Sequence, residues 1–189
     1  MKKVTITLKS LSPYTQSRMH STPKLEKENP ADYEDRTWRE KCTTDENDNI
    51  VIPPIAFKMA LDKSSKMLGM QIPNRGKSTY SKHFLAGIMA PVGITLPIKK
   101  NDAKKISINA NSDGVRGSGK RVVRHFPQVE SWSGEIEMYV VDDTVTESVF
   151  EKHMQEAGKL VGIGQYRPEN GGTCGRFRCE KFVWSDLGD

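Results

Sequence analysis

The segment 162–177 has the residue types that bind a phosphate-bearing ligand. Five glycines fall within the fourteen positions 162–175, and a tyrosine and two arginines accompany them. Because glycine lacks a Cβ, its backbone can approach another backbone or a phosphate chain closely. The arginines could then bind phosphate oxygens, and the tyrosine ring could stack on a base. We therefore predict ligand contact here, with a tight glycine hairpin packed on the core as the alternative. The candidate residues are Gly162, Gly164, Tyr166, Arg167, Gly171, Gly172 and Arg176.

Residues 109–120 form a second candidate, a loop rich in Asn, Ser, Asp and Gly that leads into a predicted strand at 121–126. Its glycines give the loop the freedom to present basic side chains, which suit phosphates and not base edges. A solvated hairpin without a ligand is the alternative. The basic residues are Arg116, Lys120, Arg121 and Arg124.

Charge is unevenly distributed along the chain. The net charge is +5, but residues 1–62 are neutral overall. Residues 63–125 hold thirteen basic and two acidic residues, a net charge of +11, and residues 126–189 hold six basic and twelve acidic residues. This asymmetry predicts a polyanion-binding face on the middle third. A solvated basic surface is the alternative, and charge alone does not decide between the two.

Other kinds of chemistry have weaker support. The stretch 76–79 is similar to the end of a phosphate-binding P-loop, but Gln71 stands where the first glycine of that motif belongs. Cys174 and Cys179 have no second pair and no histidine nearby, so a structural zinc site is not expected. No nucleophile, base and carboxylate share a recognisable signature. We predict no catalytic site, no metal site and no cofactor.

Composition restricts the setting of the protein. No apolar run approaches the roughly 20 residues that a membrane-spanning helix needs. The N-terminus alternates apolar and polar residues and lacks the continuous apolar stretch of a signal peptide. Three cysteines are too few for a disulfide framework, which favours a reducing compartment. We expect a cytoplasmic protein with no membrane partner.

The spacing of apolar residues predicts the elements that position these candidates. Alternation over 3–9 indicates a strand with one buried face. Pro53 and Pro54 suit the first turn of a helix over 55–68, and Gly69 suits its C-cap. The helix residues expected to face the core are Ile55, Met59, Leu61, Met67 and Leu68.

Residues 10–49 contain three prolines, many charges and few apolar residues, which predicts a long loop or thumb-like insertion. The aromatic residues Tyr14, Tyr33 and Trp38 indicate that parts of this segment dock on something. We interpret residues 90–125 as a second, basic insertion that contains short strands.

The last third is strongly patterned. A strand is predicted at 135–141, and Thr144 with Glu147 matches a capping box at the start of a helix. That helix places Phe150, Met154, Ala157 and Val161 at helical spacing, and a final strand covers 176–184. These elements predict one α+β domain over 1–189, with a ferredoxin-like (RRM-like) βαββαβ core and large insertions.

Three stretches together resemble the RAMP superfamily, the ferredoxin-like RNA-binding proteins of CRISPR effector complexes, and in particular their crRNA-backbone subunits. The opening strand with the Leu-Ser-Pro at 11–13 resembles the family's first strand and loop. Residues 52–61 (IPPIAFKMAL) resemble its first helix start, and 162–177 its glycine-rich loop. The chain is short for such a subunit, which favours a small or solitary relative of the kind that phages and prophages encode.

The resemblance implies a non-enzymatic protein that binds single-stranded, crRNA-like RNA through its phosphates, with copies of itself or CRISPR effector subunits as further partners in antiviral defence. It adds Lys58, at the predicted helix start, to the candidate phosphate contacts, and Trp38 to the candidate stacking residues. Three alternatives remain open: a phage inhibitor that mimics an effector subunit, a single-stranded DNA-binding protein, and an endoribonuclease subunit that uses Asp32 or Asp35.

Overall fold

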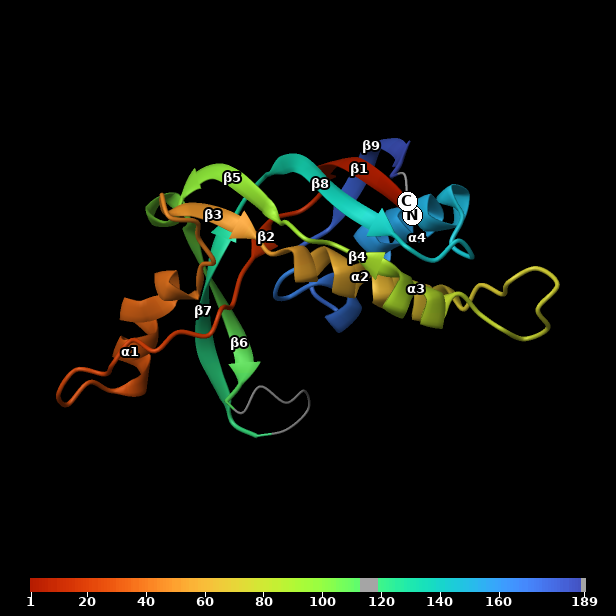
Figure 1. Ribbon diagram of the computed structural model, residues 1–189. Coiled ribbons are helices and arrows are strands. Elements are labelled where there is room, and N and C mark those ends of the chain that lie inside the picture. Colours follow the sequence, from red (N-terminus) through yellow and green to blue (C-terminus); the bar gives the residue numbers. More distant parts are fainter. Residues whose placement is uncertain (113–118, 188–189) are drawn as a thin grey trace.

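A four-stranded antiparallel sheet forms the centre of the molecule (Figure 1). The computed structural model describes residues 1–112 and 119–187. The strand order is β4-β8-β1-β9, with β1 at Lys2–Ser10, β4 at Ile88–Met89, β8 at Ser133–Val140 and β9 at Phe177–Asp186. In β1 the alternate residues Val4, Ile6 and Leu8 are fully buried, which confirms the strand predicted from their spacing.

Helices cover the buried face of this sheet (Figure 1). They are α2 at Pro54–Leu68, α3 at Ser81–Gly87 and α4 at Glu147–Glu156, which continues as a π-helical turn, η3, at Ala157–Val161. In chain order the core elements are β1, α2, β4, β8, α4 and β9, with α3 inserted before β4. This order, together with a sheet in which β1 lies between β8 and β9, is ferredoxin-like and confirms the predicted α+β class.

The predicted core face of α2 is partly wrong. Of the five predicted core residues only Leu61 is buried, and Ile55, Met59 and Met67 are 57%, 48% and 53% exposed. Phe57 and Ala60 are buried instead. Apolar residues occur on two sides of this helix, and the sheet takes the side that carries the large ring of Phe57. The predicted end is confirmed, because the helix stops at a C-cap glycine in the left-handed conformation.

The start of α4 lies two residues later than predicted. Thr146 is the N-cap, and its hydroxyl oxygen accepts the backbone N–H of Val149 at 3.4 Å. Thr144 instead belongs to a turn, in which its N–H donates to the Asp142 carboxylate. The predicted core residues of this helix are all buried, namely Phe150, Met154, Ala157 and Val161.

The segment 10–49 is more ordered than its composition predicts. It contains β2 at Tyr14–Thr15, α1 at Pro30–Thr37 and the 3₁₀ turn η1 at Trp38–Lys41. The Asn29 side chain caps α1 by accepting two backbone N–H groups, and a proline occupies the first helical position. Tyr14 and Trp38 are buried, as expected for a docked segment.

This segment docks on a long β-hairpin that extends from the body of the molecule (Figure 1). The hairpin strands β6 and β7 pair along their length, and β2 adds to the other edge of β7. The strands and turn of this region are β3 at Asn49–Ile52, β5 at Ile94–Lys99, η2 at Lys100–Asp102, β6 at Lys104–Asn111 and β7 at Arg121–Val129. No helix within the described residues is long and apolar enough to cross a bilayer.

Candidate nucleic-acid interface

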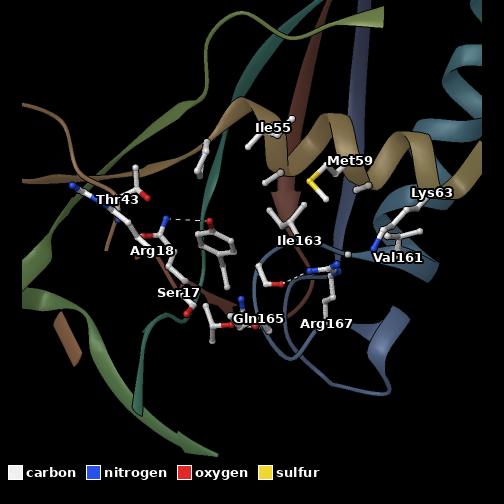
Figure 2. A pocket seen from close by; sticks show the side chains of 18 residues that line it. Ser17, Arg18, Thr43, Ile55, Met59, Lys63, Val161, Ile163, Gln165 and Arg167 are labelled. Carbon is white, nitrogen blue, oxygen red and sulfur yellow. Dashed lines mark hydrogen bonds between the residues drawn. The ribbon is translucent and has the colours of Figure 1, made fainter. Parts of the chain in front are cut away.

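A hollow of about 390 Å³ lies between the first half of α2 and the glycine-rich segment (Figure 2). One wall is α2, which contributes Ile55 and Met59. The opposite wall is the chain after η3, and the third side is β2 with the residues that follow it. The hollow therefore joins the helix start, the N-terminal loop and the glycine segment, three regions that are far apart in the sequence.

The glycines of 162–175 shape this wall by letting the chain approach itself. A Cβ on Gly164 would lie 2.1 Å from the main-chain oxygen of Thr15, and one on Gly172 would lie 1.8 Å from the main-chain oxygen of Tyr166. Gly162 has a φ of +72°, and a Cβ there would meet Pro168 at 2.6 Å. At these three positions the space that a side chain would fill is occupied by the protein itself. The tight packing that the sequence left as an alternative is thus present.

Two basic side chains at one end of the hollow share a carboxylate. Lys63 Nζ lies 2.5 Å from Glu169 Oε1, and Arg167 Nε donates to Glu169 Oε2 at 2.9 Å. Burial favours the protonated form of Glu169, but the hydrogen bonds from Lys63 and Arg167 outweigh it and lower the pKa of this carboxyl. The group of three carries one net positive charge. Glu169 lies in the short 3₁₀ turn η4, Pro168–Asn170.

Arg18 lies at the other end of the hollow. It is exposed, and its guanidinium makes no hydrogen bond or ion pair with another described residue. A second hollow of about 580 Å³ lies between this residue, α1 and the β6–β7 hairpin. Because the two hollows share Ser17, Arg18 and Gln165 in their linings, they are adjacent on a surface that runs from α2 to the hairpin. We call this surface the α2–hairpin groove.

The hairpin end of the groove is built on a buried ion-pair network. The Glu34 carboxylate of α1 accepts hydrogen bonds from Lys41 Nζ and from the backbone N–H of His125, and Arg124 lies 3.3 Å away. Burial raises the pKa of Glu34, but these hydrogen bonds and charges outweigh it, so the pKa is lowered. Lys41 also donates to the carbonyl of His125 at 2.8 Å. Arg124 lines the groove and at the same time neutralises this carboxylate.

Ion pairs reduce the basic character that the middle third has in sequence. Lys100 pairs with Glu40 at 2.6 Å, and Lys105 pairs with Asp35 at 2.6 Å. Hydrogen bonding to Lys105, with its charge, lowers the pKa of Asp35. Both carboxylates come from the segment 10–49. The docked segment therefore neutralises part of the positive charge of the hairpin and of the η2 turn before it.

The predicted phosphate contacts are divided between the groove and other surfaces. Four of them line the groove, namely Gly162, Gly164, Arg167 and Arg124. Lys120 and Arg121 are exposed at the outer end of the hairpin, where the Arg121 guanidinium donates to the Asn109 carbonyl. Arg116 lies outside the described residues.

The remaining predicted residues lie away from these linings. Lys58 has a side chain that is only 13% exposed, and its Nζ lies 2.5 Å from Asp62 and donates to carbonyls at the end of α3. Arg176 donates to the Lys159 carbonyl at 3.2 Å. Tyr166 and Gly171 are exposed beside the glycine wall, whereas Gly172 is buried in it. Trp38 is 5% exposed and the Arg39 guanidinium covers its ring, so it offers no free stacking face.

Three groove residues were missed by the sequence analysis: Arg18, Lys63 and Gln165. Arg18 carried a weak signal, because it is the only basic residue between Lys9 and Lys24. Lys63 lies five residues after Lys58, so the helical turn places it on a different side of α2. Gln165 had no signal, since an isolated glutamine is common in any loop.

The described residues hold no cluster of three or more His, Cys, Asp or Glu side chains that could bind a metal ion. Asp32 accepts a hydrogen bond from the Asn29 side chain, and Asp35 faces the hairpin through Lys105. The stretch 76–79 lies in the connection between α2 and α3 and does not start a helix, unlike a P-loop.

The strand order and the helices define the class of fold, a ferredoxin-like α+β fold with a hairpin insertion. No family model matches the sequence, and no curated protein matches it either. Among solved structures, the chain is similar to one in "Cryo-EM structure of the Type III-B Cmr-beta bound to cognate target RNA", with a TM-score of 0.52 and 10% identity. The match covers 97% of this chain and 60% of that chain, so this protein spans less than two thirds of its neighbour's length. It is also similar to Cmr6 from Pyrococcus furiosus, with a TM-score of 0.49 and 13% identity over 94% of this chain and 97% of that one. The fold of this chain is thus similar to that of a chain in the type III-B Cmr-beta complex.

Proposed function

We propose that this protein binds single-stranded RNA through phosphate contacts along the α2–hairpin groove. The observation that carries the proposal is the position of Arg18, a cation that lines both hollows and whose guanidinium has no partner among the described residues. Arg167 with Lys63 stands at one end, and Arg121 and Lys120 stand beyond the other. Cations spaced along a groove suit a flexible single strand, because its backbone can follow the curved surface.

RNA is proposed over DNA because the fold is similar to a chain from a complex described as bound to cognate target RNA. The strand would be crRNA-like, and CRISPR effector subunits or further copies of this chain would be protein partners. Contacts to phosphates carry no sequence information, so binding would be independent of sequence to first order.

Titration with labelled RNA and DNA of one sequence tests the proposal directly. We expect RNA to bind more tightly than single-stranded DNA and duplex RNA, with an affinity that falls as salt is raised. Gel filtration of the mixtures reports whether several copies assemble on one strand. A preference for DNA would replace the proposal by a single-stranded DNA-binding function, and indifference to both would favour a protein partner.

The proposed role is binding and not catalysis. We expect labelled RNA to stay intact during incubation with the protein and magnesium, and the Asp32→Ala and Asp35→Ala variants to behave identically. Cleavage that is lost in either variant would establish the endoribonuclease alternative instead.

A further inference from the structure

The α2–hairpin groove has an apolar floor at its α2 end. Ile55 and Met59 are 57% and 48% exposed, and both point from α2 into the hollow (Figure 2). Ile163 lies across from them on the glycine wall, but it is only 1% exposed, so Ile55 and Met59 supply the accessible apolar surface. Single exposed apolar residues are common on protein surfaces. Ile55 and Met59, however, lie one turn apart on α2 and line a concave site between cations. Phosphate contacts alone do not explain them, because a charged phosphate gains nothing from apolar contact.

Polar side chains with spare hydrogen-bonding capacity stand opposite this floor. Gln165 and Ser17 are exposed and Thr43 is half-buried, and the side chains of all three make no hydrogen bond with another described residue. The nearby Gln16 amide is already used, because it donates to Tyr14 and Val51 and accepts from the backbone N–H of Thr43. The hollow thus combines an apolar floor with donors and acceptors that make no hydrogen bond with other described residues.

We propose that this hollow takes one nucleobase of the bound RNA, turned inward against Ile55 and Met59 while its edge reaches Gln165. This inference rests on the proposed function and deepens it. A base has an apolar face and a polar edge, which match the two sides of the hollow, and its phosphates reach Arg18 on one side and Arg167 on the other. The volume of about 390 Å³ falls within the range of about 300–1,000 Å³ typical of ligand pockets.

The experiment compares two RNA probes on three proteins by fluorescence anisotropy. One probe is an oligouridylate of about twelve nucleotides, a length within the site sizes of single-strand binders. The other is a ribose-phosphate chain of the same length that lacks its bases. The proteins are the wild type, the double variant Ile55→Ala with Met59→Ala, and the control Met67→Ala. Met67 is also on α2 and 53% exposed, but it is outside the hollow. All three positions are exposed, so the variants keep the core intact.

We expect the double variant to bind the oligouridylate about five- to tenfold more weakly, as the loss of about 1 kcal/mol or more of apolar contact predicts. Its affinity for the base-free chain and its salt dependence should equal those of the wild type, and Met67→Ala should change neither. An equal loss on both probes, or no loss on either, overturns the inference.

Two further outcomes separate this inference from the proposed function. If the wild type binds the oligouridylate and Arg18→Ala weakens this binding, but the double variant binds as tightly as the wild type, the proposed groove is supported and the proposed base pocket is refuted. If the wild type binds no RNA, both fall together. Free uridine monophosphate is the last probe, and binding as tight as that of the oligomer would show a mononucleotide site and overturn the placement of a base within a bound strand.

Discussion

Replacement of Arg18 by alanine is the sharpest test of the groove, because the structure separates its charge from any structural role. The Arg18 side chain is exposed and has no ion-pair partner among the described residues. Its removal therefore leaves no buried charge behind, and the free energy of unfolding should change by less than about 0.5 kcal/mol. Arg124 is a poorer choice, because its loss would leave the buried Glu34 carboxylate with one cation fewer.

The size of the effect follows from the number of cations that remain available in the groove and at the outer end of the hairpin beyond it. Arg18, Lys120, Arg121 and the single net charge of the Lys63–Arg167–Glu169 group give about four phosphate contacts. For single strands the logarithm of the affinity falls with the logarithm of salt with a slope of about −0.7 per contact. The wild type should show a slope of about −3, and Arg18→Ala should reduce its magnitude by about 0.7.

The assay is anisotropy with the oligouridylate at four or more salt concentrations. Lys181→Ala is the matched control: Lys181 is also exposed, but it lies on β9 opposite Thr7, on the face of the sheet away from α2. The control should leave both the affinity and the slope unchanged. Equal behaviour of Arg18→Ala and Lys181→Ala would refute the assignment of the groove.

Three further predictions concern stability. Glu34→Ala should lower the free energy of unfolding in urea by about 3 kcal/mol, because it leaves the Lys41 ammonium buried without its carboxylate, and adding Lys41→Met should restore part of the loss. Burial lowers the pKa of His153, so its imidazole binds a proton less readily in the folded state than in the unfolded state. Melting temperatures should fall as the pH drops below about 6.5, the ordinary histidine pKa, and less so in His153→Phe. Gly164→Ala should destabilise far more than Gly69→Ala. Both glycines have positive φ, but only the first would push a Cβ to 2.1 Å from a main-chain oxygen, and the second has open space and should lose about 1–2 kcal/mol.

The core of the fold could be predicted because local patterns and tertiary packing agree there. The alternation in β1 and the helical spacing in α4 both match the buried residues. In α2 the local pattern is ambiguous, since apolar residues occupy two sides and only the sheet decides which is buried. The side of α2 that does not pack on the sheet carries Ile55 and Met59, and this side lines the groove.

The candidate site was harder to predict because it depends on pairing between distant segments. The sequence marks Lys105 and Lys100 as basic, but it does not show that Asp35 and Glu40 neutralise them across about 60 to 70 residues of chain. The sequence predicts ligand contact at the glycine segment, and that remains a prediction. Its glycines, however, accommodate main-chain oxygens of the protein's own chain, which a single sequence does not reveal.

These two findings change what the charge pattern means for binding. Acidic residues of 10–49 pair with Lys100, Lys105 and Arg124 and hold α1 and η1 on the hairpin, so part of the excess of positive charge serves assembly of this lobe and not ligand attraction. The cations that line the groove are few, and an apolar hollow lies between two of them, Arg18 and Arg167. Such a surface fixes the position of the bound strand along the groove, because particular phosphates contact particular cations and one base enters the hollow. Affinity should therefore depend on a few contacts in fixed positions, and single substitutions should have measurable effects.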